Sequence, residues 1–173
     1  MEPERISPLP RCRPFPKSLG AGPAWNDLRP PQVELTGALL EVIHAGVTIA
    51  STTHGIRVFE ESNCPTYYFP TSDVKTGFLH AMHHTTRCEW KGLASYWTLN
   101  VRGREAEAAA WSYLNPNEGY EQLTAYLAFA AGRVDACYVG REKVVAQPSD
   151  CYGGWAMQKI DGRFKDPHGS TPW

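Results

Sequence analysis

The chain lacks an excess of charge of either sign. Over its 173 residues it carries 17 Lys and Arg against 18 Asp and Glu, which gives a formal net charge of −1. Proteins that hold nucleic acid or an anionic membrane through phosphate groups concentrate basic residues, and this composition offers no such excess. No apolar run is long enough to span a bilayer either. We therefore expect neither nucleic acid nor a membrane among the partners.

Cysteine pairs at metal-binding spacing are also absent. Zinc ribbons use C-x-x-C pairs to place two thiolates on one tetrahedral ion, and the cysteines here form no such pair. Their odd number fits reduced thiols, so we expect a cytoplasmic protein with no structural metal and no cofactor. Prolines interrupt any apolar region that an N-terminal secretory signal would need. The five cysteines are Cys12, Cys64, Cys88, Cys137 and Cys151.

Proline is plentiful at the start of the chain and sets the expected domain limits. Residues 1–37 hold eight of the fourteen prolines, which fix φ and remove backbone donors. We assign 1–24 as a Pro-rich tail and 25–37 as a docked strap, because the indole of Trp25 can anchor it. One domain is predicted over 25–173, including an aromatic C-terminal tail that docks to bury its rings.

Short apolar stretches separated by glycine turns dominate the rest of the sequence. Such repeats predict β-hairpins, and three of them in one domain predict an antiparallel sheet. Further strands are expected over 56–60 and 67–69. The alanine-rich stretch 105–111 favours a helix by propensity, but we assign it as a strand because packing in a sheet overrides propensity. The three hairpins pair 39–44 with 47–49, 95–101 with 106–113, and 134–139 with 144–145.

One helix is predicted over 116–131. Asn115 can cap it, Pro116 suits its first turn, and Gly132 supplies a C-terminal stop. The predicted fold is therefore mainly β and antiparallel, with one short helix and a Pro-rich N-terminal arm. The residues that recur at helical spacing are Tyr120, Leu123, Leu127 and Ala130.

Four stretches of the sequence carry a family resemblance. They are 57–60 leading to 65–70, 88–97, 110–113, and 152–155 with 164–165. In the order and spacing of these stretches the chain resembles DUF427, a bacterial and eukaryotic family of unknown function to which a nucleotidyltransferase-like label is sometimes attached. The resemblance implies an antiparallel β-tent-like domain with a short helix, and it implies no established reaction.

Nucleotidyl transfer is not expected from this chain. Palm-type transferases place carboxylates to hold metal ions between phosphate oxygens, commonly as Asp-x-Asp, and the sequence contains no Asp-x-Asp. A G-x-x-x-x-G-K-[ST] phosphate loop is missing as well. The residues therefore do not support the transferase label.

Aromatic residues with a few charged groups form the candidate ligand site. Tyrosines and tryptophans exceed what a small β core requires, and a ring-lined pocket with a few polar groups is the common form of a small-molecule site. Segments 67–69, 88–97 and 111–113 would wall such a pocket, with no catalytic residue assigned. The predicted ligand-binding residues are Glu60, Tyr68, Cys88, Lys91, Tyr96, Trp111, Tyr113 and Tyr152.

The function predicted from these residues is small-ligand binding, with or without catalysis. Glu60 and Lys91 would supply charge, and Tyr152 would close one side of the pocket from the C-terminal tail. The alternative is a non-catalytic protein-interaction module, in which the aromatic residues build the core and the Pro-rich arm meets a partner. A monomer or a weak homo-oligomer is expected in either case.

Thiol and metal chemistry are further alternatives. A nearby ammonium at Lys91 would favour a nucleophilic thiolate at Cys88, with His83 or His84 as its base. An inert, buried Cys88 is the simpler interpretation. His80 and His84 would share one face only if their segment were helical, so we expect surface histidines in a loop rather than a metal site.

Overall fold

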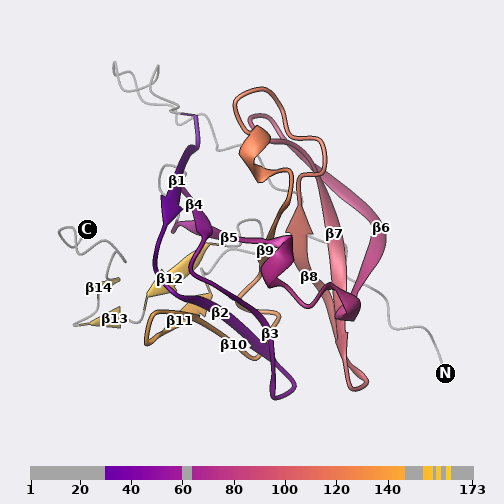
Figure 1. Ribbon diagram of the computed structural model, residues 1–173, viewed down its shortest axis with the longest axis vertical. Helices are drawn as coiled ribbons and strands as arrows, with labels where there is room; N and C mark the ends of the chain where they lie inside the picture. Colours follow the sequence, from indigo (N-terminus) through magenta and orange to yellow (C-terminus); the bar gives the residue numbers. More distant parts are fainter. Residues whose placement is uncertain (1–29, 60–63, 147–153, 158, 161–162, 165–173) are drawn as a thin grey trace.

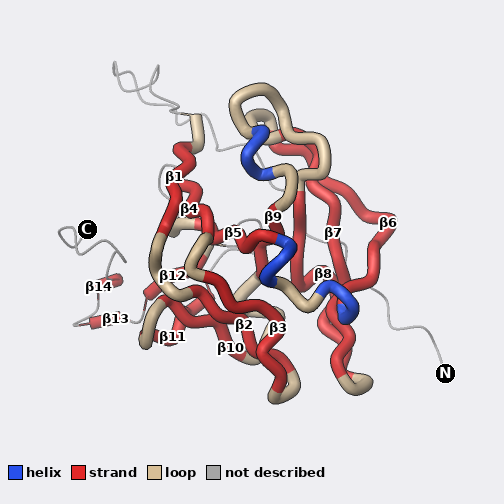
Figure 2. Tube along the Cα trace, in the orientation of Figure 1, coloured by secondary structure: helices blue, strands red, loops and turns tan. Residues whose placement is uncertain are grey.

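Two antiparallel sheets form the fold (Figures 1 and 2). In the part of the chain that the structure describes, the paired strands of both sheets run antiparallel. The prediction of a mainly β, antiparallel domain is confirmed. The computed structural model describes residues 30–59, 64–146, 154–157, 159–160 and 163–164.

The larger sheet has seven strands, and β1 and β6 are its two edges. Its long strands β6, β7 and β8 stand side by side in Figure 1. In spatial order it consists of β1 (Gln32–Thr36), β4 (Gly55–Phe59), β5 (Thr66–Pro70), β9 (Tyr126–Phe129), β8 (Arg104–Ser112), β7 (Gly92–Val101) and β6 (Leu79–Cys88).

The smaller sheet has five strands, and a separate two-stranded ribbon follows it in the chain. The ribbon pairs β13 (Lys159–Ile160) with β14 (Arg163–Phe164). In spatial order the five-stranded sheet consists of β12 (Trp155–Met157), β11 (Glu142–Ala146), β10 (Ala136–Val139), β2 (Leu40–His44) and β3 (Val47–Thr52).

The three hairpins predicted from glycine turns are confirmed as β2–β3, β7–β8 and β10–β11. Two of their turns use a left-handed backbone at both central residues. Ala45 and Gly46 have φ of 50° and 74°, and Arg102 and Gly103 have φ of 53° and 80°. Paired left-handed residues match the right-handed twist of the flanking strands, which is why a glycine follows each bulkier residue. The alanine-rich stretch is strand β8, as predicted.

The helix predicted over 116–131 is wrong. The segment forms one short 3-10 turn, η4 (Glu121–Leu123), and then strand β9 between β5 and β8. The helical spacing fails because its residues serve different faces of the sheet. In β9, Ala128 packs in one hydrophobic cluster, whereas Leu127 and Phe129 pack in the other. Alternate burial of this kind is the pattern of a strand covered on both sides.

The first hydrophobic core combines buried residues of both sheets. Trp155 of β12 lies at its centre with no exposed surface, and its indole Nε1 donates a hydrogen bond to the carbonyl oxygen of Phe129 at 2.9 Å. Its ring lies 5.2 Å from the Tyr67 ring and 5.9 Å from the Phe69 ring, centroid to centroid. This residue attaches the chain after β11 to the larger sheet.

The segment 25–37, predicted as a docked strap, contains the edge strand β1. Pro31 is buried just before it, while Trp25 lies outside the described residues. The other helical pieces are the 3-10 turns η2 (Thr71–Asp73) and η3 (Thr76–Phe78). None of the helices in the described part of the chain has the length and hydrophobicity needed to cross a membrane.

Candidate functional site

One face of the seven-stranded sheet carries a row of large side chains. Residues directly opposite one another on antiparallel strands share a face, with Cβ atoms about 4.5–5.5 Å apart. This face packs as a second hydrophobic cluster, separate from the core shared with the smaller sheet. We call it the aromatic face. From β7 to β1 the row runs through Tyr96, Trp111, Ala128, Tyr68, Ile56 and Leu35.

Burial on the aromatic face is graded. Tyr68 and Tyr113 are nearly sealed, with exposed fractions of 0% and 5%. Tyr96, Trp111 and Cys88 are only partly buried, although they pack against the same cluster. The part of the face over β6, β7 and β8 therefore reaches the surface, and the part over β5 is solid packing.

A covering loop, residues 114–125, joins β8 to β9 and spans this face. The hydroxyl of Tyr120 donates to the carbonyl oxygen of Pro31 at 3.0 Å, next to edge strand β1. Asn117 binds the opposite edge, because its backbone N–H donates to the carbonyl oxygen of Lys91 at 2.9 Å. Its side-chain Nδ2 also donates to the carbonyl oxygen of Trp90 at 3.2 Å. One loop thus connects both edges of the sheet; it lies above β7 and β8 in Figure 1.

A carboxylate stabilises the bend of the covering loop. Glu121 accepts a hydrogen bond from the backbone N–H of Gly119 at 3.0 Å. Its own backbone N–H and that of Gly119 lower the pKa of the Glu121 carboxyl group, because both hydrogen bonds favour the charged form. Gly119 has φ of 93°, a left-handed backbone that suits glycine.

Lys91 is the buried cation of the aromatic face. Its exposed fraction is 5%, and its Nζ lies 5.5 Å from the centroid of the Tyr113 ring. That distance is within the range of a cation–π interaction. The β6–β7 turn holds the residue in place through Gly92, whose φ is 108°, and through the backbone N–H of Lys91, which donates to the Cys88 Sγ at 3.4 Å. The sequence indicates the charge but not its burial.

The Cys88 thiol lies at the end of β6, on the same side as the aromatic cluster. His84 precedes it by four residues along the strand, a rise of about 13 Å. That separation is too long for a direct hydrogen bond between the imidazole and the thiol. His83 lies at an alternate position on β6 and is exposed. The geometry therefore gives Cys88 neither of the two predicted bases.

The prediction that His80, His83 and His84 lie in a loop is wrong, because all three belong to β6. The sequence did not predict this strand, because β6 is an edge strand in which exposed residues alternate with residues that are only partly buried. The His84 ring lies 5.4 Å from the Tyr96 ring, centroid to centroid. Among the described residues, no group of three or more His, Cys, Asp or Glu side chains could hold a metal ion.

Two of the predicted ligand-binding residues, Glu60 and Tyr152, lie outside the described residues. The other six gather on the aromatic face or at its rim: Tyr68, Cys88, Lys91, Tyr96, Trp111 and Tyr113.

A charged pair that the sequence did not indicate lies at the β1 edge. Arg57 of β4 donates through Nη2 to the Glu34 Oε2 at 2.7 Å, and its guanidinium lies 4.9 Å from the centroid of the Phe59 ring. The two residues belong to paired strands and stand directly opposite one another.

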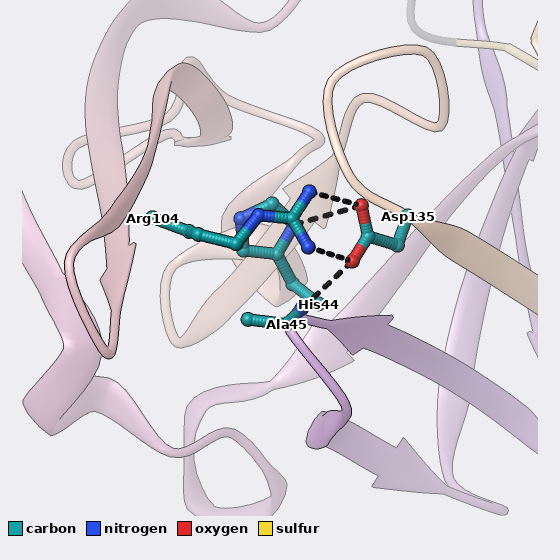
Figure 3. A network of polar contacts seen from close by, with 4 residues as sticks. All are labelled: His44, Ala45, Arg104 and Asp135. Carbon is teal, nitrogen blue, oxygen red and sulfur yellow. Dashed lines mark hydrogen bonds and ion pairs between the residues drawn. The ribbon is translucent and has the colours of Figure 1, made fainter.

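A second polar network lies away from the aromatic face and joins two hairpin turns (Figure 3). Asp135 accepts the backbone N–H of Ala45 at 2.8 Å and two hydrogen bonds from Arg104, each at 3.0 Å. His44 is 4% exposed, with its Nδ1 3.7 Å from Asp135. The Ala45 N–H, with Arg104 as a further cause, lowers the pKa of the Asp135 carboxyl group. These partners are far apart in sequence, so no local pattern indicates the network.

Comparison with known protein families gives a match. The sequence model of a family described as a domain of unknown function (DUF427) matches residues 32–140, more than half of the chain. That range includes both edges of the larger sheet, the covering loop and the Lys91 turn. No curated protein matches the sequence.

Proposed function

The chain belongs to the DUF427 family, whose description names no activity, and we propose that it is a small-ligand-binding domain. The ligand lies against the partly exposed rings of Tyr96 and Trp111 on the aromatic face. Lys91, Tyr68 and Tyr113 form the buried floor and side of the site. Cys88 lies at its rim.

The burial of Lys91 is the observation that carries the proposal. An ammonium group loses solvation when it is buried, so it is retained at a buried position only where other groups repay that cost. A small β core is equally well filled by a methionine at such a position. A charge buried among aromatic rings is typical of binding and catalytic sites.

The graded burial of the aromatic face supports the same proposal. A planar molecule gains most where rings offer a flat surface that still reaches solvent. Tyr96 and Trp111 stand directly opposite one another on β7 and β8 and meet this condition. If the bound molecule reacts, the thiol of Cys88 is the nearest nucleophile on the rim.

A cytoplasmic location belongs to this proposal. Cys88 and Cys137 are free thiols in the described part of the chain. Reduced cysteines fit the cytoplasm, where thiols are kept from forming disulfides.

A thermal-shift screen with nucleotides, sugars, amino acids and aromatic acids tests the proposal. A compound that binds only the native state raises the melting temperature by mass action. At 100 times Kd the gain is about 2.7 kcal/mol, which corresponds to roughly 5–10 °C for a chain of this size. Trp111→Leu should abolish the shift.

Trp90→Leu is the matched control for this screen. Trp90 is 41% exposed in the β6–β7 turn and lies outside the aromatic cluster, so its replacement should leave the shift unchanged. The proposal fails if no compound raises the melting temperature, or if both variants respond to every hit as the wild type does.

The alternative function, a non-catalytic interaction module, is favoured by one group of exposed apolar side chains. Trp90, Leu93 and Leu114 are 41%, 50% and 51% exposed. They lie before β7, near its start, and just past the end of β8, which is the same end of two adjacent antiparallel strands. Exposed apolar groups that gather in this way mark contact surfaces.

Sedimentation velocity separates the two functions. In a ligand-binding domain, Leu93→Glu should leave the sedimentation coefficient unchanged at every concentration. Association that grows with concentration and is removed by Leu93→Glu would favour the interaction module.

A further inference from the structure

One imidazole nitrogen on the aromatic side of β6 has no hydrogen-bond partner among the described residues. The Nε2 atom of His84 is buried there, beside the ring of Tyr96. Buried side-chain nitrogens in folded proteins are nearly always hydrogen-bonded, and an exception calls for an explanation. Leaving such a group unsatisfied costs about 1–3 kcal/mol.

A break in the strand ladder positions this side chain. The pairing of β6 with β7 runs through Ala81 and Trp97 and resumes at Thr85 and Ser95. Three residues of β6 therefore stand against Tyr96 alone, and His84 is one of them. Bulges of this kind re-aim a side chain at the expense of ladder hydrogen bonds, and they are frequent next to binding sites.

The neighbouring polar groups are already paired with one another. The hydroxyl of Tyr96 and the Oγ1 of Thr86 are 2.9 Å apart, and Thr86 is two residues from His84 on the same side of β6. Among the described residues, no carboxylate forms an ion pair with His84. These neighbours therefore do not supply a hydrogen-bond partner for the Nε2 atom of His84.

We infer that His84 recognises an anionic oxygen group of the ligand, so that the ligand is a planar ring bearing a carboxylate or a phosphate. The ring stacks over Tyr96 and Trp111, and Nε2–H of His84 donates to the oxygen. A hydrogen bond to a charged oxygen is about twice as strong as one between neutral groups. This inference rests on the proposed function and adds to it a specificity-determining residue and a ligand class.

Two pairs of probes test the inference on the full chain by calorimetry and NMR. Benzoate is compared with neutral benzamide, and adenosine 5′-monophosphate with adenosine. In the wild type the anion of at least one pair should bind about tenfold or more tightly than its neutral counterpart. A preference for benzoate over benzamide indicates a carboxylate ligand, and a preference for adenosine 5′-monophosphate over adenosine indicates a phosphate ligand. The ¹⁵N signal of His84 Nε2 should shift when that anion is added.

His84→Gln should remove the preference for the anion and leave the affinity of the neutral probe within about twofold. His83→Gln, on an exposed neighbouring position of the same strand, is the matched control and should keep the preference. His84→Asn replaces His84→Gln if the latter unfolds. The wild-type ¹⁵N signal needs no variant, and its failure to move with a bound anion overturns the inference.

The remaining outcomes are also decisive. If His84→Gln weakens the binding of the anion and of the neutral probe equally, or weakens neither, the role of His84 is overturned. Failure of all four probes while the broader screen yields another ligand overturns the ligand class and leaves the proposed function intact. No ligand from any source overturns both.

Discussion

The ammonium of Lys91 lies 5.5 Å from the centroid of the Tyr113 ring and is almost completely buried. The two residues come from different strand ends, and the covering loop fixes the turn that carries Lys91 through its hydrogen bond from Asn117. A cation against a ring is worth about 0.5–2 kcal/mol, which is less than the several kcal/mol that burying an ammonium group costs. Lys91 is therefore not expected to be a major source of stability.

Lys91→Met should leave the fold intact and abolish ligand binding. The change removes the interactions of the ammonium group, the cation–π contact among them, together with its desolvation cost, so the free energy of unfolding should change by no more than about 2 kcal/mol. Urea unfolding measures this quantity, and the thermal-shift screen measures binding. Lys143→Met, at an exposed position of β11, should change neither. A Lys91→Met chain that cannot fold would show that the ammonium is structural.

Tyr120→Phe should loosen the covering loop. The variant keeps the buried ring but leaves the Pro31 carbonyl oxygen without its donor, at a cost of about 1–2 kcal/mol. Amide hydrogen exchange should rise in residues 114–125 and at the start of β1. Tyr126→Phe keeps the Tyr120–Pro31 hydrogen bond and should leave exchange in the loop unchanged. Equal exchange in both variants would contradict the bridging role of Tyr120.

Trp155→Phe should destabilise the protein by about 2–4 kcal/mol, because it leaves a cavity in the first core and removes the hydrogen bond from the indole to the Phe129 carbonyl oxygen. Chemical denaturation followed by circular dichroism measures the loss. Trp90→Phe, at an exposed position, should stay within about 0.5 kcal/mol of the wild type. Similar losses in the two variants would argue against Trp155 as the anchor between the sheets.

Asp135→Asn should show a pH-dependent effect on stability. The pKa of Asp135 in the folded chain lies below its ordinary value of 3.8, so its contribution is present above that value and is lost as pH falls through the lowered pKa. The melting temperature of Asp135→Asn should be lower than that of the wild type at pH 7, and the gap should narrow below about pH 4. Glu142→Gln, an exposed control on β11, should show no such trend. A gap that stays constant with pH would contradict the account.

Cys137 should resist alkylation in the folded protein. Burial raises the pKa of its thiol to about 12, so the reactive thiolate is scarce at pH 8. Iodoacetamide followed by mass spectrometry should label the partly buried Cys88 first and Cys137 only on unfolding. Equal labelling rates without denaturant would show that the first core opens on the timescale of the reaction.

Much of the fold could be predicted because its hairpins are local. A glycine after Ala45 or Arg102 marks a two-residue turn, and apolar alternation marks the strands on either side. Strand β9 could not be found in this way. It pairs Ala128 with Tyr68, sixty residues earlier, and is buried on both faces, so its sequence has the same apolar content as a helix. The edge strands β1 and β6 were not predicted, because about half of their residues are exposed and their apolar pattern is weak.

The candidate site was partly visible in the sequence. Tyr96 and Trp111 lie on strands that the hairpin pattern pairs, but the register that sets them opposite one another depends on an irregularity between Trp97 and Leu99. The burial of Lys91 and the orientation of His84 were not visible, because one depends on a turn held by a distant loop and the other on a strand bulge. Neither feature leaves a local sequence signal.

Indole N–H signals in a ¹H–¹⁵N spectrum test the central claim most directly. The indoles of Trp111, Trp155 and Trp90 report on the aromatic face, the first core and the exposed turn, respectively. On addition of a compound that raises the melting temperature, the Trp111 indole and the Lys91 backbone amide should shift while Trp155 and Trp90 stay in place. Shifts confined to Trp90 and Leu93, with Trp111 unchanged, would show that the ligand does not bind the aromatic face.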